Sequence, residues 1–216
     1  MIFINDNPVR WFKQDHVLRE ADHVMNKKLA GTYQANLYFS LDLPETQPSA
    51  TGKSDFAEED DFADENEFSE ESVAPTLSMK NPEAIAYIDK VETFLKTVKN
   101  KEGNTIIGGA VSIVDILKKV GDVALGDNSL PTSQEKISQY MFLFESGDPK
   151  KGKDMWKFIK PGDSDGAQMW LLFKSGDNQG TITVVNALTE FMKNNPPPVL
   201  TTATGEKIQL KVDWSG

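Results

Sequence analysis

Three residues with metal-binding side chains lie near the start of the chain at the spacing of one helix face: His16, Glu20 and His23. At about 100° per residue, positions i, i+4 and i+7 fall within about 60° of one another around a helix axis. Imidazole and carboxylate groups bind zinc, so such a face could supply three ligands. Nothing in the sequence supplies a fourth ligand or the outer residues that orient such ligands. We therefore interpret these residues as an ordinary solvated helix face and predict no metal site.

Two patterns could have indicated an enzyme. Gly52, Lys53 and Ser54 resemble the end of a phosphate-binding loop, but that motif requires another glycine five residues before Gly52, where the chain has Gln47. With two histidines, no cysteine and no Gly-x-Ser-x-Gly motif, the sequence assembles no nucleophile beside a base. We therefore expect no enzymatic activity, no catalytic residues and no cofactor.

The charge is concentrated in one segment. The net charge is −10, and residues 55–71 contain ten acidic residues and no basic one, so the rest of the chain is neutral. Nucleic-acid binding requires a basic face that displaces counterions from phosphate, and this composition argues against it.

The strongest basic feature is a cluster of lysines beside Trp156. Asp148 and Asp154 offset its charge, and we interpret it as the exposed side of a hairpin. The cluster consists of Lys150, Lys151, Lys153, Lys157 and Lys160.

The acidic segment contains three six-residue units, DFAEED, DFADEN and EFSEES, each with phenylalanine second. Charge repulsion and few apolar residues predict a disordered insert over residues 45–79. The units lack the ligand spacing of a calcium-binding EF-hand loop. Docking on a basic partner and loose cation binding remain as alternatives to a plain linker.

The leading segment is predicted to be an amphipathic helix over residues 8–30, with Gly31 as a C-cap candidate and an apolar stripe that we expect to pack against another surface. The stripe consists of Val17, Leu18, Ala21, Val24, Met25 and Leu29. Residues 32–41 then alternate with period two, which predicts a half-buried strand. The longest nearly apolar run, residues 106–114, is half of the roughly 18 residues that a membrane-spanning helix needs, so we expect no such helix.

Further elements follow from residue 80 onward. Asn81 and Pro82 predict the start of a helix, residues 105–111 a short strand, and residues 113–124 a second helix. Thr132 and Glu135 fit a capping box for a third helix. Residues 155–159 and 167–174 are predicted to form an antiparallel hairpin, followed by a helix capped at residue 177 or 178 and a cleanly alternating strand over residues 207–214.

This order of elements predicts an α+β fold of the ferredoxin-like, split β-α-β type. Its four-stranded antiparallel sheet would carry helices on one face, with a leading helix and two inserted helices as additions. We expect one domain in three stretches: residues 1–44 with the leading helix and first strand, the insert over 45–79, and the remainder over 80–216. Many functions share this fold, so it names none by itself.

Several motifs resemble those of a known family. They are Asn5-Asp6-Asn7-Pro8, Arg19-x-x-Asp22, Leu29-x-Gly31-Thr32-Tyr33, Ser112-Ile113-Val114-Asp115-Ile116, Pro131-x-Ser133-x-Glu135-x-Ile137-x-Gln139-Tyr140, and QMWLLFKSGD from Gln168 to Asp177. In this order they resemble the large extracytoplasmic loop of RND-superfamily exporters, in the MMPL-like branch that exports hydrophobic compounds. The resemblance covers nearly the whole chain except residues 45–79, where the acidic insert departs from the family pattern. These are signatures of a loop domain and not of a catalytic site.

The resemblance implies a function. It suggests that the chain is one excised loop of a polytopic inner-membrane protein, more similar to the loop of the second half, on the extracytoplasmic (periplasmic) face. Such porter domains accept hydrophobic or amphiphilic substrates and pass them on by subdomain movement. Proton-motive force would act through ionisable residues in membrane helices that lie outside this chain. The partners would be the remainder of the transporter and a hydrophobic or amphiphilic small molecule or lipid.

Four aromatic residues are hypothetical substrate contacts between the sheet and the inserted helices: Tyr140, Phe144, Trp156 and Trp170. The simpler interpretation is that they are core residues. The alternative function is a soluble ferredoxin-like module that senses a small ligand, dimerises through its sheet and regulates an enzyme. Apolar flanking segments in the full gene product would favour the exporter, and polar flanks would favour the sensor.

Overall fold

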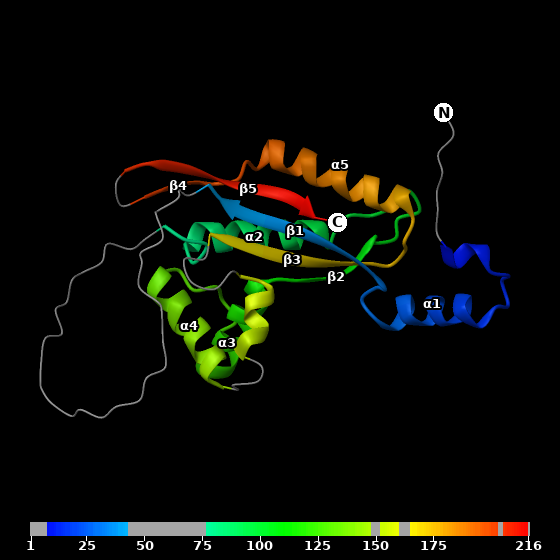
Figure 1. Ribbon diagram of the computed structural model, residues 1–216, viewed down its shortest axis with the longest axis horizontal. Helices are drawn as coiled ribbons and strands as arrows, with labels where there is room; N and C mark the ends of the chain where they lie inside the picture. The colour runs from blue at the N-terminus through cyan, green and yellow to red at the C-terminus, as the bar shows by residue number, and fades with distance from the viewer. Residues whose placement is uncertain (1–7, 43–76, 148–151, 160–164, 203–204, 216) are drawn as a thin grey trace, which may run out of the picture.

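The computed structural model describes residues 8–42, 77–147, 152–159, 165–202 and 205–215. Within these ranges the protein has an α+β fold, with α-helices packed on an antiparallel five-stranded sheet (Figure 1). The helices are η1 (Pro8–Trp11), α1 (Val17–Lys28), α2 (Pro82–Leu95), α3 (Ile113–Leu125), α4 (Gln134–Gly147), η2 (Gly152–Lys157) and α5 (Asn178–Asn194). The strands are β1 (Tyr33–Leu41), β2 (Ile107–Val111), β3 (Gly166–Phe173), β4 (Val199–Thr201) and β5 (Lys207–Ser215).

The strands lie in the order β2-β3-β1-β5-β4, and each neighbouring pair is antiparallel. Consequently β1 and β2 run parallel with β3 between them, and β3 and β5 run parallel with β1 between them. Helix α2 connects the first of these parallel pairs, and α5 lies in the connection of the second. Each of these two connections therefore crosses over the one strand that lies between the two strands it joins.

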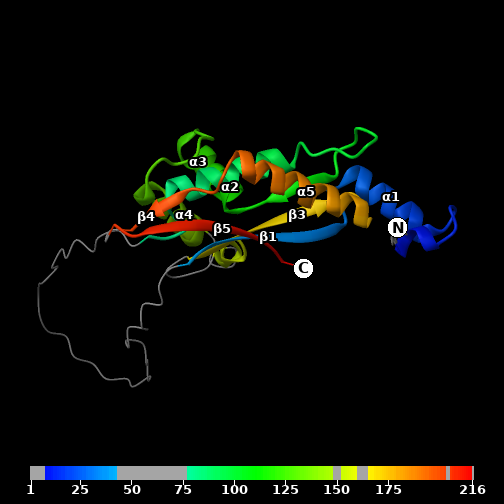
Figure 2. The ribbon, with the colours of Figure 1, turned by 90° about the horizontal axis from the view of Figure 1, so that it is seen from above.

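The core lies between the sheet and the two connecting helices. Strand β3 alternates strictly, with Ala167, Met169, Leu171 and Phe173 buried and the residues between them partly exposed. This period-two pattern places all the buried side chains on one face of the sheet. Figure 2 shows α2 and α5 on the same side of the sheet. The two helices meet through the stacked rings of Phe94 and Phe191, whose centroids lie 4.2 Å apart.

The hairpin predicted over residues 155–174 is wrong in its first arm. Residues 152–157 form the 3₁₀ helix η2, and the segment pairs with β3 through an isolated bridge between Ile159 and Ala167 instead of a strand. Met155, Phe158 and Ile159 are buried while Trp156 and Lys157 are exposed. That spacing fits a helical turn that packs on the core, and a strand would instead have buried alternate residues.

Three smaller predictions also need correction. The sheet has a fifth strand, β4, which the sequence pattern did not reveal because three residues are too few to show an alternation. Helix α4 is capped by Ser133, whose hydroxyl accepts a hydrogen bond from the Lys136 backbone N–H at 3.2 Å, so the predicted cap at Thr132 is wrong by one residue. The C-cap of α1 is Leu29 and not Gly31.

The prediction that the leading helix packs through its apolar stripe is wrong in the described part of the chain. None of the twelve residues of α1 is buried, and the stripe faces away from the sheet. The polar side of α1 faces the body instead, because the Thr32 hydroxyl lies 3.2 Å from carboxylate and amide oxygens of Asp22 and Asn26. Figure 1 shows α1 projecting beyond the end of the sheet at which β1 begins.

The edge strands of the sheet are irregular. Strand β2 pairs with β3 through a register shift between Ile107 and Gly109. A Cβ atom on Gly108 would lie 1.8 Å from the Ala30 carbonyl oxygen, so only glycine allows the chain after α1 to pass so close to this edge. At the other edge, β4 is three residues long and follows Pro196, Pro197 and Pro198.

The predicted insert lies almost entirely outside the described residues. Its last three residues, Leu77, Ser78 and Met79, are described, and they are buried against the core. The prediction of disorder is therefore wrong for these three residues. Over the ranges that the structure describes, each helix is too short or too polar to cross a membrane.

Candidate apolar binding groove

An apolar groove lies between α3 and α4. Figure 1 shows these two helices beside the sheet. Its volume is about 350 Å³. The lining residues are Lys119, Val120, Val123 and Ala124 of α3 and Leu143, Phe144 and Gly147 of α4. Lys119 is the one charged residue in this lining, and its ammonium group is paired with Asp122 at 3.1 Å. The groove is therefore suited to an apolar ligand or to the apolar part of an amphiphile.

The two helices have more apolar residues than their packing uses. Helix α3 buries Ile113, Val114 and Leu117, whereas Val123, near its end, is 75% exposed. On α4, Leu143 of the groove lining is 49% exposed. Contiguous exposed apolar side chains are uncommon on a protein surface and mark places where something binds.

The apolar surface continues on the other side of Leu143. A second depression of about 350 Å³ shares Ala124 and Leu143 with the groove and extends to Tyr140. Its remaining lining is largely polar and consists of Leu125, Ser133, Glu135, Lys136 and Gln139. The Lys136 ammonium group lies 5.6 Å from the centroid of the Tyr140 ring. The groove thus runs from an apolar end to a polar rim.

Close packing between the helices fixes the width of this surface. A Cβ atom on Gly121 would lie 2.5 Å from the Asp127 carbonyl oxygen and 3.2 Å from the Tyr140 ring. Helix α3 is followed by its C-cap Gly126 in the left-handed conformation, with φ of 66°, which favours glycine. In the following turn, the backbone N–H and then the hydroxyl of Ser129 donate to Asp127 and lower the pKa of its carboxyl group.

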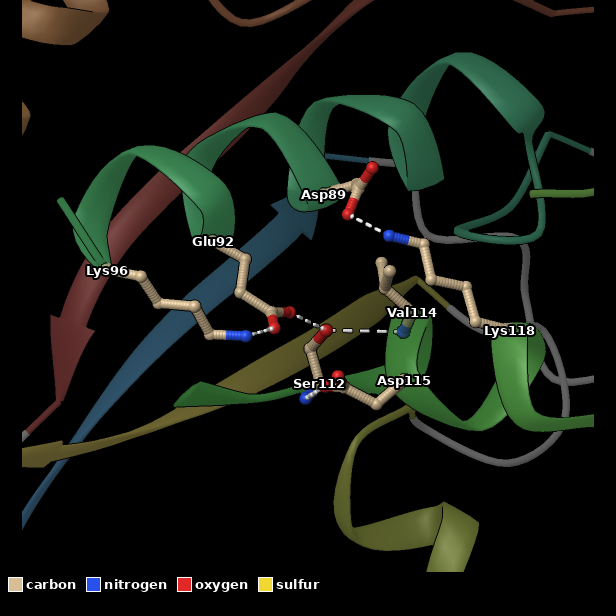
Figure 3. A network of polar contacts seen from close by, with 7 residues as sticks. All are labelled: Asp89, Glu92, Lys96, Ser112, Val114, Asp115 and Lys118. Carbon is tan, nitrogen blue, oxygen red and sulfur yellow. Dashed lines mark hydrogen bonds and ion pairs between the residues drawn. The ribbon is translucent and has the colours of Figure 1, made fainter. Parts of the chain in front are cut away.

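A polar network fixes the start of α3 to α2. The Ser112 hydroxyl accepts a hydrogen bond from the Val114 N–H at 3.2 Å, and the Ser112 N–H donates to Asp115 at 2.9 Å, which completes a capping box. The same hydroxyl donates to the Glu92 carboxylate at 2.6 Å. Figure 3 shows this carboxylate between Ser112 and the ammonium group of Lys96.

Glu92 is the most unusual residue of this network because it is only 3% exposed. Burial raises the pKa of its carboxyl group, while the hydrogen bonds from Lys96 and Ser112 oppose that effect. Lys118 of α3 adds a second link to α2 through its ion pair with Asp89 at 2.7 Å (Figure 3). These contacts hold α3 in a defined position, so one wall of the groove is rigidly attached to the core.

The four aromatic residues predicted as substrate contacts do not come together. Phe144 lines the groove, and Tyr140 is buried beside it and lines the second depression. Trp156 lines a separate depression with Tyr38 of β1, and its indole N–H donates to Glu145 at 2.7 Å. Trp170 packs against Phe158, with ring centroids 4.9 Å apart. The prediction of a shared contact surface therefore applies at most to Phe144 and Tyr140.

The sequence interpretation missed the main groove residues Val123 and Leu143 and the buried Glu92. Val123 lies seven residues after Ile116, within about 20° of it around the axis of α3, so the helical spacing was a readable signal that Val123 borders the apolar face. Glu92 lies four residues after Ile88 and three before Leu95, which places it on the buried stripe of α2.

The other candidate residues are placed by the structure only in part, and residues 52–54 and the three acidic units lie outside the described ranges. His16 is the N-cap of α1: its Nδ1 accepts from the Leu18 N–H at 3.2 Å, and its ring stacks on Phe12. Within the described ranges, no three His, Cys, Asp or Glu side chains are grouped to hold a metal ion. In the basic cluster, Lys157 pairs with Asp154 at 2.6 Å, and Lys150, Lys151 and Lys160 lie outside the described residues.

Comparison with known family models, with curated proteins and with solved structures finds no match. The resemblance to RND-superfamily exporters therefore stays a prediction from the sequence. The groove and the packing around it are the observations on which a functional proposal can be based.

Proposed function

We propose that this protein is the extracytoplasmic domain of an RND-type exporter of the MMPL-like branch, and that the α3–α4 groove handles a hydrophobic or amphiphilic substrate. The observation that carries the proposal is the groove itself, which is lined by apolar side chains on two helices inserted between β2 and β3. The motif resemblance supports the same class of substrate.

The proposal includes a ferredoxin-like core. Strands β2-β3-β1-β5, with α2 and α5, have the connectivity of two interleaved β-α-β units, and β4 adds a short edge strand. In this description α3, α4 and η2 are one insertion, which is additional to the ferredoxin-like pattern and packs on the core through residues such as Leu117, Ile137 and Met155. Since the contacts of Ser112 and Lys118 fix α3 to α2, the subdomain movement that passes the substrate on would carry the insertion and the core together.

The role of the chain would be binding and transfer, without bond-making or bond-breaking. The remainder of the transporter would supply membrane helices whose ionisable residues use the proton-motive force. The domain would lie on the extracytoplasmic face of the membrane. A substrate with an apolar tail fits the groove, and its polar end would lie at the rim near Lys136 and Gln139.

Binding of the uncharged fluorescent probe N-phenyl-1-naphthylamine tests the groove. We expect saturable binding to the 216-residue chain and about fivefold to tenfold weaker binding by Phe144→Ala, because a large part of one aromatic contact surface is lost. Ile182→Ala on α5 is the control, since Ile182 is an exposed apolar residue far from the groove in sequence and outside its lining. Absence of saturable binding, or equal loss in the control, would contradict the proposal.

The sensor remains the second candidate, and one observation favours it. Tyr38 is exposed on the sheet face opposite to the buried Leu37 and Phe39, so that face could pair with a second copy. Sedimentation velocity separates the two candidates. A dimer that Tyr38→Lys dissociates would favour the sensor, and a monomer together with apolar segments flanking the chain in the full gene product would favour the exporter.

A further inference from the structure

Helix α1 has its amphipathic pattern turned outward. Around its axis the apolar residues occupy one arc, from Val24 and Val17 through Met25 and Leu18, and all four are exposed. The side that faces the sheet carries Asp22 and Asn26 and is polar. An apolar stripe that points away from its own protein indicates an external surface that covers it.

The turn before α1 extends this stripe with aromatic residues. Trp11 is 75% exposed and Phe12 is exposed beside it. Two contacts hold the turn on the helix: the Arg19 guanidinium donates to the Phe12 carbonyl at 3.2 Å, and the Phe12 ring stacks on His16 at 4.5 Å. The tryptophan is therefore presented at the end of α1 by an ordered part of the chain.

Lysines lie at both ends of this segment and interrupt the apolar arc, whose sides are bordered by Glu20 and Asp22; residues 8–28 together contain five basic and three acidic residues. Lys13 follows the aromatic pair, and Lys27 and Lys28 lie in the last turn of α1; all three are exposed. At about 100° per residue, Lys28 falls between Val17 and Ala21, inside the arc itself. A lysine in that place would have to be buried in a dry protein interface, whereas at a lipid surface its long side chain reaches the headgroups.

We propose that α1, together with Trp11 and Phe12, binds the surface of a lipid bilayer that contains anionic headgroups. Amphipathic helices with Trp, Phe and Leu on one side and lysines beside them lie in the headgroup region of membranes. A second copy of the chain fits less well, because one face of a twelve-residue helix is far smaller than the roughly 20–30 residues per side of a stable interface.

Helix α1 lies at one end of the described structure. Figures 1 and 2 show it beyond one end of the sheet, away from α4 and β4. The inference goes beyond the proposed function because it concerns α1 and not the groove. Either can fail without the other.

Cosedimentation of the 216-residue chain with vesicles tests the inference. We expect binding to mixed phosphatidylcholine–phosphatidylglycerol vesicles and weaker binding to phosphatidylcholine alone. The double variant Leu18→Glu, Met25→Glu should lower the affinity for mixed vesicles at least about tenfold, because two apolar contacts are replaced by charges that the headgroups repel. Lys28→Gln should weaken binding to the mixed vesicles and leave binding to phosphatidylcholine unchanged.

Ile182→Glu on α5 is the matched control, because Ile182 is 44% exposed and Met25 is 45% exposed. This variant should bind vesicles like the unchanged protein, and circular dichroism should show the same helix content in all variants. Failure of the unchanged protein to bind either vesicle overturns the inference, and so does an equal loss in the control. Vesicle-independent dimerisation that the double variant abolishes would overturn it in favour of a second copy.

Discussion

Helices α1 and α2 carry the same kind of sequence pattern and end in opposite environments. Each has apolar residues at helical spacing and a side-chain N-cap, His16 for α1 and Asn81 for α2. Yet seven residues of α2 are buried, including the charged residue Glu92, whereas no residue of α1 is buried. Periodicity therefore establishes that a segment is an amphipathic helix, but it does not tell whether the apolar face meets the protein's own core or an external partner.

The largest effect is expected in the core helix. Val91 of α2 is fully buried, and Val91→Ala should lower the free energy of unfolding by about 2 kcal/mol, because the substitution removes buried methyl groups and leaves a cavity. Urea denaturation followed by circular dichroism measures this change. A loss below about 0.5 kcal/mol would mean that α2 is no more integrated into the core than α1.

A smaller effect concerns the buried carboxylate of α2. Because the folded-state pKa of Glu92 is raised, the native protein holds its proton to higher pH than the unfolded chain does. The free energy of unfolding should therefore fall as the pH rises from the ordinary pKa of 4.5 to the raised value, and Glu92→Gln should lack this contribution. Urea denaturation of both proteins between about pH 4 and pH 7 measures the difference.

The other carboxyl groups are present in both the unchanged protein and Glu92→Gln. Their contributions to the free energy of unfolding therefore cancel when the two proteins are compared. A wild-type stability that stays constant relative to Glu92→Gln over this pH range would contradict the raised pKa. An increase relative to the variant would mean that the contacts with Lys96 and Ser112 outweigh burial.

The smallest effect is expected on α1. Val24→Ala makes the same chemical change as Val91→Ala, but Val24 is exposed, so the free energy of unfolding should change by less than about 0.5 kcal/mol. The same urea denaturation measures it. A loss comparable to that of Val91→Ala would show that α1 is covered by its own chain, and this would contradict both the comparison and the membrane inference.

Much of the fold could be predicted from the sequence because its central elements have strong local patterns. Strand β5 alternates, and Asn81 with Pro82 marks the start of α2. The segment 155–159 was misread because aromatic and aliphatic residues in a five-residue run fit a strand and a helical turn alike. Only the packing of Met155 on the core decides between the two.

The groove was harder to foresee than the strands. The sequence gives the helical spacing of Tyr140 and Phe144, but the face of α4 that remains open depends on how α3 lies against it. That arrangement depends on Gly121 and on the contact between Glu92 and Ser112, which are twenty residues apart. Long-range contacts of this kind leave no periodic signal in the chain.

The outer strands of the sheet have a consequence for how the protein behaves at high concentration. An open, regular edge strand is a template on which another polypeptide can add a strand, and this is a common start of aggregation. Here one border is interrupted by a register shift where Ala30 crowds Gly108, and the other ends in three residues next to consecutive prolines. Both borders are poor templates, so the sheet is protected against growth from molecule to molecule.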